Sequence, residues 1–223
     1  MKKSTATDWK TSLERLTQGN ERFVSGLRSA DTFLGHLKLR ELAERGQKPF
    51  AIVLSCSDSR VPAELLFDCG FGELFVIRVA GNVVQPSQIA SIEYAAKVLG
   101  ASLCLVMGHS KCGAVQAALD SETGKSPDLG PNISFLIDLI RPSVQKCLAD
   151  GGLQSNTLDR CIEENVHQTG AEIFEKSTIL RTLAGEDRFR LVEAVCDLET
   201  GKVTFEQPGS KTEPGPGVIR KVI

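Results

Sequence analysis

The sequence lacks a long apolar run. No stretch of about 18 apolar residues occurs in it, so no segment is expected to span a bilayer. It also has little net charge, −2 at pH 7 with a pI near 6.0, and therefore offers no general electrostatic attraction to nucleic acid or to an anionic membrane. The first ten residues include lysines, but no apolar core follows them, which is not the pattern of a secretory signal. We expect no nucleic-acid partner and no membrane partner.

Paired C-x-x-C spacings, which are typical of structural zinc knuckles, are absent although the chain has seven cysteines. An odd cysteine count in a chain of 223 residues is not that of a small disulfide-linked domain, so we expect free thiols in a reducing cytoplasm. No internal repeat and no linker divides the chain. We predict one domain over residues 1–223, with residues 1–7 and about 207–223 as mobile ends.

Hydrophobic periodicity predicts alternating strands and helices. The expected strands lie at residues 50–54, 73–80 and 102–107, and the expected helices between and after them at 62–67, 86–99, 112–119, 133–149 (interrupted or kinked at Pro142) and from 152 to about 177. This alternation predicts an α/β fold with a mostly parallel central sheet flanked by helices. Residues 189–198 and 202–205 are expected to form a terminal hairpin that adds an antiparallel edge strand.

Two amphipathic helices are expected before the first strand, at about residues 8–25 and 34–45. Periodicity does not decide whether they pack on their own sheet or cross to a partner subunit. The segment at residues 121–131 is rich in Gly, Pro, Ser and Asp and is expected to be a loop.

Two short motifs carry the chemistry. C-S-D-S-R at residues 56–60 follows the first apolar run, and H-S-K-C-G at residues 109–113 follows the third. If the extended conformation continues, Cys56, Asp58 and Arg60 share one side of the chain. Ser110 is the expected N-cap of the next helix, whose first turn then holds Cys112. Because open α/β sheets bind ligands at the carboxyl ends of their strands, we expect the two motifs to converge.

Cys56, His109 and Cys112 together make a three-ligand zinc set, which is typical of a catalytic site with an open fourth position. Asp58 could fill that position or hold the water that does, and a bidentate pair with Arg60 would keep the carboxylate off the metal. Each residue also has a simpler interpretation: a buried thiol, a core histidine or a structural ion pair. The presence of all five at this spacing favours the metal site.

The motif C-x-D-x-R followed by H-x-x-C-G resembles that of the β-class carbonic anhydrases, and the similarity extends over about residues 47–119. This resemblance implies zinc-dependent reversible hydration of CO2 to bicarbonate and a proton by zinc-bound hydroxide. Asp58 would accept the hydrogen bond of that hydroxide, and Arg60 would keep Asp58 ionised. The resemblance also implies a homodimer or homotetramer in which the amino-terminal helices reach a partner subunit.

The resemblance gives four further residues a role in substrate binding. It implies that Gln47 donates a hydrogen bond to bicarbonate and that Phe75 and Tyr94 line an apolar CO2 pocket. Without it, these two aromatic residues are ordinary core positions. Gly113 is expected to let the backbone approach the site closely. Val53 and Ser55 stand where the bicarbonate-regulated subgroup has Trp and Gly, which favours the unregulated subgroup.

Three alternatives stay open. Carbonyl sulfide and carbon disulfide hydrolases resemble the same family and use the same ligand set. A structural or regulatory zinc protein would result if Asp58 permanently closed the coordination sphere. A thiol redox protein would need neighbouring reactive thiols, which H-S-K-C does not supply.

Overall fold

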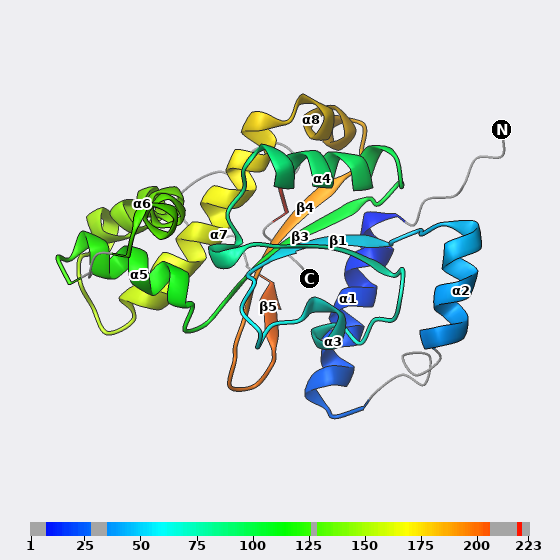
Figure 1. The fold of residues 1–223 in the computed structure, drawn as a ribbon, viewed down its shortest axis with the longest axis horizontal. Helices are drawn as coiled ribbons and strands as arrows, with labels where there is room; N and C mark the ends of the chain where they lie inside the picture. The colour runs from blue at the N-terminus through cyan, green and yellow to red at the C-terminus, as the bar shows by residue number, and fades with distance from the viewer. Residues whose placement is uncertain (1–7, 28–34, 126–128, 206–217, 220–223) are drawn as a thin grey trace.

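The structure, a computed structural model, describes residues 8–27, 35–125, 129–205 and 218–219. A six-stranded sheet with the order β2-β1-β3-β4-β5 forms its centre, and β6 pairs with β4 (Figure 1). The strands are β1 (Ala51–Ser55), β2 (Leu74–Arg78), β3 (Leu103–His109), β4 (Arg190–Cys196), β5 (Val203–Phe205) and β6 (Val218–Ile219). The helices are α1 (Trp9–Val24), α2 (Gly35–Arg45), α3 (Ala63–Leu66), η2 (Ala80–Asn82), α4 (Pro86–Lys97), α5 (Gly113–Glu122), α6 (Pro131–Gly151), α7 (Thr157–Lys176) and α8 (Thr178–Gly185).

The sheet is mostly parallel. Strands β2, β1, β3 and β4 are parallel neighbours, and β5 returns antiparallel to β4 at the edge. The predicted α/β fold and its terminal hairpin are therefore confirmed. The short strand β6 runs parallel to β4 at Leu191–Val192, so residues 218–219 of the expected mobile tail belong to the sheet. The other residues of that tail, and residues 1–7, lie outside the described residues.

Two apolar layers cover the sheet. Both central strands, β1 and β3, are buried along their whole length, and their alternate side chains point to opposite faces. Ala51 and Val53 belong to the layer that includes α1, α3, α5 and α6, whereas Ile52 and Leu54 belong to the layer that includes α4 and α8. Figure 1 shows α4 and α8 on one side of the sheet and α1 and α3 on the other.

The first two helices differ in how they pack. Helix α1 starts at the N-cap Asp8, buries Leu13 and Leu16, and is fixed to the sheet by Ser12 Oγ, which donates to Phe50 O at 2.8 Å. Helix α2 leaves large apolar side chains in solvent, and Leu37 is 68% exposed. The question left open by the sequence is thus answered for α1, which packs on its own chain.

Two helices differ in extent from the prediction. Helix α6 runs as one element from Pro131 to Gly151 through Pro142, which excludes the interruption that was one of the two alternatives expected there. A proline inside a helix removes one hydrogen bond, and the burial of Ile137, Ile140 and Val144 on one face of α6 offsets that loss. Helix α5 continues to Glu122, so residues 121–122 are helical rather than part of a loop.

None of the helices in the described ranges is long and apolar enough to cross a bilayer.

Candidate metal centre

Strands β1 and β3 end side by side and bring the two motifs together. They are parallel neighbours with Ser55 opposite Met107, so the residues that follow them meet at the same edge of the sheet. Cys56 comes directly after β1, and His109 is the last residue of β3. Cys112 is the N-cap of α5. The convergence expected from the sequence therefore follows from the parallel register.

The side chains of Cys56, His109 and Cys112 form a compact cluster. Their ligand atoms all lie within 4.8 Å of one another, and all three residues are buried. His109 Nδ1 donates to Ser110 O at 2.9 Å, which leaves the lone pair on Nε2. That Nε2 atom is buried and has no hydrogen-bond partner among the described residues. Two sulfurs beside an imidazole nitrogen with a free lone pair fit a zinc ion.

The two thiols are electrostatically unequal. The Cys112 thiol hydrogen-bonds to Cys56 and lowers the pKa of the Cys56 thiol, and the Gly81 backbone N–H lowers it further. The same bond to Cys56, together with burial, raises the pKa of Cys112. The lowered pKa of Cys56 favours its thiolate, the form that a metal ligand needs.

Asp58 and Arg60 form a bidentate ion pair beside this cluster. Arg60 Nε lies 2.8 Å from Asp58 Oδ1 and Nη2 lies 2.6 Å from Oδ2. Asp58 Oδ2 is 3.8 Å from His109 Nε2. The Arg60 guanidinium holds the pKa of the Asp58 carboxyl well below its usual range. The carboxylate is thus ionised and engaged with Arg60 next to the candidate metal position.

Two local predictions about these motifs were wrong. Strand β1 ends at Ser55, so Asp58 and Arg60 do not lie on an extended strand. They lie in a turn, in which Val61 N donates a hydrogen bond to Asp58 O at 3.1 Å. Ser110 does not cap α5, because its Oγ accepts a hydrogen bond from Leu198 N at 2.9 Å. Cys112 occupies the cap position instead, which places its sulfur at the amino end of the helix, where thiolate is favoured.

Residues from other segments support the cluster, and they were not predicted from the sequence. Arg78, at the end of β2, donates from Nε to Cys56 O at 3.1 Å and from Nη2 to Asp58 O at 2.6 Å. Gly81 N donates to Cys56 Sγ at 3.3 Å. The position of Arg78 at the carboxyl end of a strand next to β1 was a signal that could have suggested its role.

Three of the four residues assigned to substrate binding, Gln47, Phe75 and Tyr94, do not gather at this cluster within one chain. Gln47 is exposed and precedes β1. Phe75 pairs with Ile52, four residues before Cys56, or roughly 13 Å along a strand. The Tyr94 ring is 6.4 Å from the Phe75 ring, and this tyrosine is 50% exposed.

Gly113, the first residue of α5, is adjacent to the ligand Cys112. A Cβ atom placed on it would meet no heavy atom within 4 Å. The described chain therefore leaves open space beside Gly113, and its expected role at the site stays a prediction.

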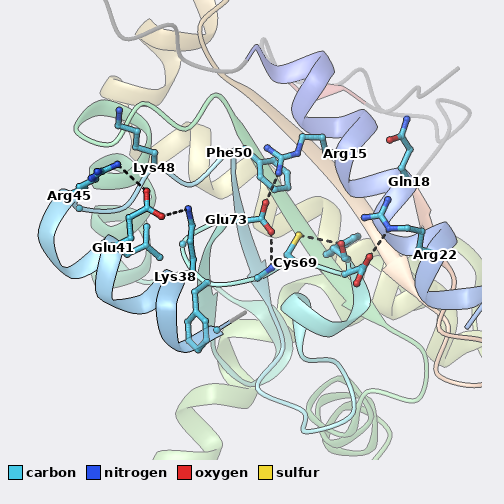
Figure 2. A pocket seen from close by; sticks show the side chains of 18 residues that line it. Arg15, Gln18, Arg22, Lys38, Glu41, Arg45, Lys48, Phe50, Cys69 and Glu73 are labelled. Atoms are coloured by element: carbon cyan, nitrogen blue, oxygen red, sulfur yellow. Dashed lines mark hydrogen bonds and ion pairs between the residues drawn. The ribbon is translucent and has the colours of Figure 1, made fainter. Parts of the chain in front are cut away.

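A separate cavity of about 820 Å³ lies between α1, α2 and the segment that precedes β2 (Figure 2). Its charged lining residues are Arg15, Arg22, Lys38, Glu41, Arg45, Lys48, Asp68 and Glu73. Most of these charges pair with one another: Arg15 with Glu73, Arg22 with Asp68, and Glu41 with Lys38 and Arg45. None of the cluster ligands lines this cavity, so it is distinct from the candidate metal centre.

Comparison with known proteins agrees with this site. A family model described as carbonic anhydrase matches residues 51–203. Carbonic anhydrase 2 of Mycobacterium tuberculosis is 35% identical over 192 residues, covering 85% of this chain and 89% of the relative. The carbonic anhydrase of Synechococcus elongatus is 30% identical, covering 82% and 70% respectively. The crystal structure of the β-carbonic anhydrase CafA of Aspergillus fumigatus superposes with a TM-score of 0.68 at 25% identity, covering 83% of this chain and 86% of that one.

The sheet and the cluster define an α/β protein with a candidate three-ligand zinc site at the carboxyl ends of two adjacent parallel strands. The chain belongs to the β-carbonic anhydrase family.

Proposed function

We propose that this protein catalyses the reversible hydration of CO2 to bicarbonate and a proton, with zinc held by Cys56, His109 and Cys112. The observation that carries the proposal is the convergence of three buried ligand atoms within 4.8 Å, one of them the imidazole Nε2 that lacks a hydrogen-bond partner among the described residues. A zinc ion bound there would act as a Lewis acid and generate a strong nucleophile from water near neutral pH.

Asp58 and Arg60 orient the reaction in this proposal. Asp58 accepts a hydrogen bond from the attacking oxygen and so directs the lone pair of that oxygen toward CO2. Arg60 keeps Asp58 ionised and, by engaging both of its carboxylate oxygens at 2.8 and 2.6 Å, keeps it from closing the metal coordination sphere. The bidentate pair thus supports an open catalytic site over a structural zinc site.

We further propose that the active form is a homo-oligomer in which Gln47, Phe75 and Tyr94 serve the metal cluster of a neighbouring subunit. Gln47 and Tyr94 are exposed, and the half-buried Phe75 pairs with Ile52 roughly 13 Å along the strand from Cys56, which supports this arrangement. Exposed Leu37 and Leu39 on α2 supply apolar surface for contact between subunits. One of the similar solved structures is described as a tetrameric β-carbonic anhydrase.

The central test combines metal analysis with stopped-flow CO2 hydration. Purified protein should contain about one zinc per chain and hydrate CO2, whereas Cys112→Ser and His109→Gln should lose most of the metal and nearly all activity, because a site reduced to two protein ligands binds zinc far less tightly. Cys69→Ser is the matched control, since Cys69 is a buried free thiol outside the cluster. Zinc-loaded protein without CO2 hydration would contradict the proposal.

A further inference from the structure

The turn that contains Gly81 touches one of the candidate zinc ligands. Gly81 is buried, and its N–H donates to Cys56 Sγ at 3.3 Å. The residue has φ 72°, a left-handed conformation that glycine adopts without strain. A Cβ at this position would also lie 2.6 Å from Ile140 Cδ1. The left-handed conformation therefore favours glycine here, and in this conformation its N–H points at the sulfur.

A side chain from α7 hydrogen-bonds to the carbonyl oxygen of Gly81. Asn165 Nδ2 donates to Gly81 O at 2.7 Å, and Asn165 is only 2% exposed. Its Oδ1 faces Ser143 Oγ of α6 at 3.4 Å. The asparagine is thus fixed between two helices and the turn, and it connects α7 through a single glycine to the Cys56 sulfur.

We infer that Asn165 is a positioning residue for the metal centre: it holds Gly81 so that the Gly81 N–H stays directed at the Cys56 sulfur. The inference rests on the zinc site proposed above. A hydrogen bond to a ligand sulfur fixes the direction of the ligand and reduces its electron donation to the metal, and the loss of such outer partners typically weakens metal affinity or activity by about 10- to 100-fold.

Removing the amide of Asn165 has a defined structural consequence. The Gly81 carbonyl would be left buried without its partner, which costs the desolvation of that group. The turn is expected to rotate until the carbonyl reaches water or another donor. That rotation would withdraw the Gly81 N–H from Cys56, although neither Cys56 nor any other ligand has been changed.

The experiment measures the metal site directly in Asn165→Ala and in the milder Asn165→Ser. The first readout is the rate at which zinc passes from the protein to a chromogenic chelator. The second is the thiolate-to-cobalt charge-transfer absorption after replacement of zinc by Co²⁺. We expect both variants to release zinc about 10- to 100-fold faster than the wild type and to shift the charge-transfer band.

Asn20→Ala is the matched control. Asn20 is another buried asparagine, 5% exposed, and its Nδ2 donates to Leu66 O at 3.1 Å and to Gly201 O at 2.9 Å. Its loss should lower the unfolding midpoint as much as the loss of Asn165. Zinc release and the cobalt spectrum should nevertheless stay at the wild-type values, because no hydrogen bond among the described residues connects Asn20 to the cluster.

The outcomes separate this inference from the proposed function. A wild-type protein that binds no zinc overturns the proposed site itself. A zinc-binding wild type whose folded Asn165 variants keep the same release rate and cobalt spectrum overturns only the positioning role. The positioning role is also overturned if no Asn165 variant folds while Asn20→Ala does, because the asparagine then supports the fold and not the metal ligand.

Discussion

Asp58 is held by Arg60 through both carboxylate oxygens, and this pairing controls how the carboxyl titrates. Its depressed pKa means that Asp58 is ionised at every pH above its usual titration range. Protonation of Asp58 therefore cannot explain a change in activity between pH 6 and 9. In the proposed mechanism, Asp58 contributes a fixed hydrogen-bond acceptor.

Replacing that acceptor tests its role. Asp58→Asn should lower the rate of CO2 hydration by about 10²-fold, because the amide loses the charge that Arg60 binds and can present its NH2 group to the attacking oxygen. The zinc content should stay unchanged, since Asp58 is not among the cluster ligands. Asp138→Asn, which breaks the Asp138–Arg141 pair on α6, is the control and should keep full activity. Unaltered turnover in Asp58→Asn would contradict the assignment.

The two thiolate ligands determine the pH dependence. Two thiolates cancel the formal charge of zinc, whereas three imidazoles leave it doubly positive, so water at this site should be less acidic than in a three-histidine site, where its pKa is about 7. Activity measured by stopped flow should therefore rise from pH 6 toward pH 9. Because Asp58 is already ionised across this range, Asp58→Asn should lower the whole profile without moving its inflection. A wild-type profile that is flat down to pH 6 is the result that this charge argument does not allow.

At the residue scale, the sequence was sufficient to predict the three candidate ligands that the structure brings together, but not the residues that support them. Cys56, His109 and Cys112 were recognisable because their types suit zinc and because each lies at the end of a predicted strand or the start of a helix. Asn165 was not recognisable, since it is 84 positions from Gly81 and only the packing of α7 brings them together. A buried asparagine in a helix also has no pattern that distinguishes support of a site from ordinary core packing.

At the element scale, periodicity predicted strands and helices well but not the polar groups buried between them. Strand β4 was predicted as part of the terminal hairpin, and it contains Glu193, which is 1% exposed. His167 of α7 lies with Nδ1 2.5 Å from Glu193 Oε2. Gly170 leaves room for the carboxylate, because a Cβ there would lie 2.5 Å from Glu193 Oε1. Such pairs arise from the way α7 crosses the sheet, which periodicity does not determine.

The crossing of α1 over α3 gives a prediction about elements. A Cβ on Gly19 would lie 2.0 Å from Phe67 O, and backbone cannot move aside as a flexible side chain can. Gly19→Ala should therefore push α1 off the sheet and lower the free energy of unfolding by about 2–3 kcal/mol. Urea unfolding at equal protein concentration measures this change.

Gly185→Ala is the control for that measurement. Gly185 ends α8, and a Cβ there would meet nothing within 4 Å, so the substitution should be neutral or stabilising by up to about 1 kcal/mol. Equal stability of the two variants would show that α1 does not make the close backbone contact with Phe67.

At the scale of the whole molecule, the separation of Gln47, Phe75 and Tyr94 from the cluster has a consequence for assembly. Gln47 precedes β1, Phe75 pairs with Ile52 near the start of that strand, and Tyr94 lies beside Phe75 on α4. In our proposal, another copy of the chain brings these residues to a substrate at the metal. The sequence motifs could assign these residues to the site but could not assign them to a subunit. That distinction depends on the symmetry of the assembly, in which each contact between two copies occurs twice.

Mixing two defective subunits tests this assignment. His109→Gln should inactivate the cluster of its own subunit. The double variant Gln47→Ala, Tyr94→Ala should keep its own cluster but lack the residues proposed to bind substrate at the cluster of the neighbouring subunit. If sites are shared, a heterodimer pairs the intact cluster of the second variant with the intact Gln47 and Tyr94 of the first. An equal mixture, refolded or co-expressed, should then regain about one quarter of wild-type CO2 hydration, since half of the dimers are mixed and half of their sites are complete. Each variant alone is the control, and light scattering checks that both are oligomers. A mixture no more active than the mean of the two separate variants would show that Gln47 and Tyr94 act within their own subunit or not at all.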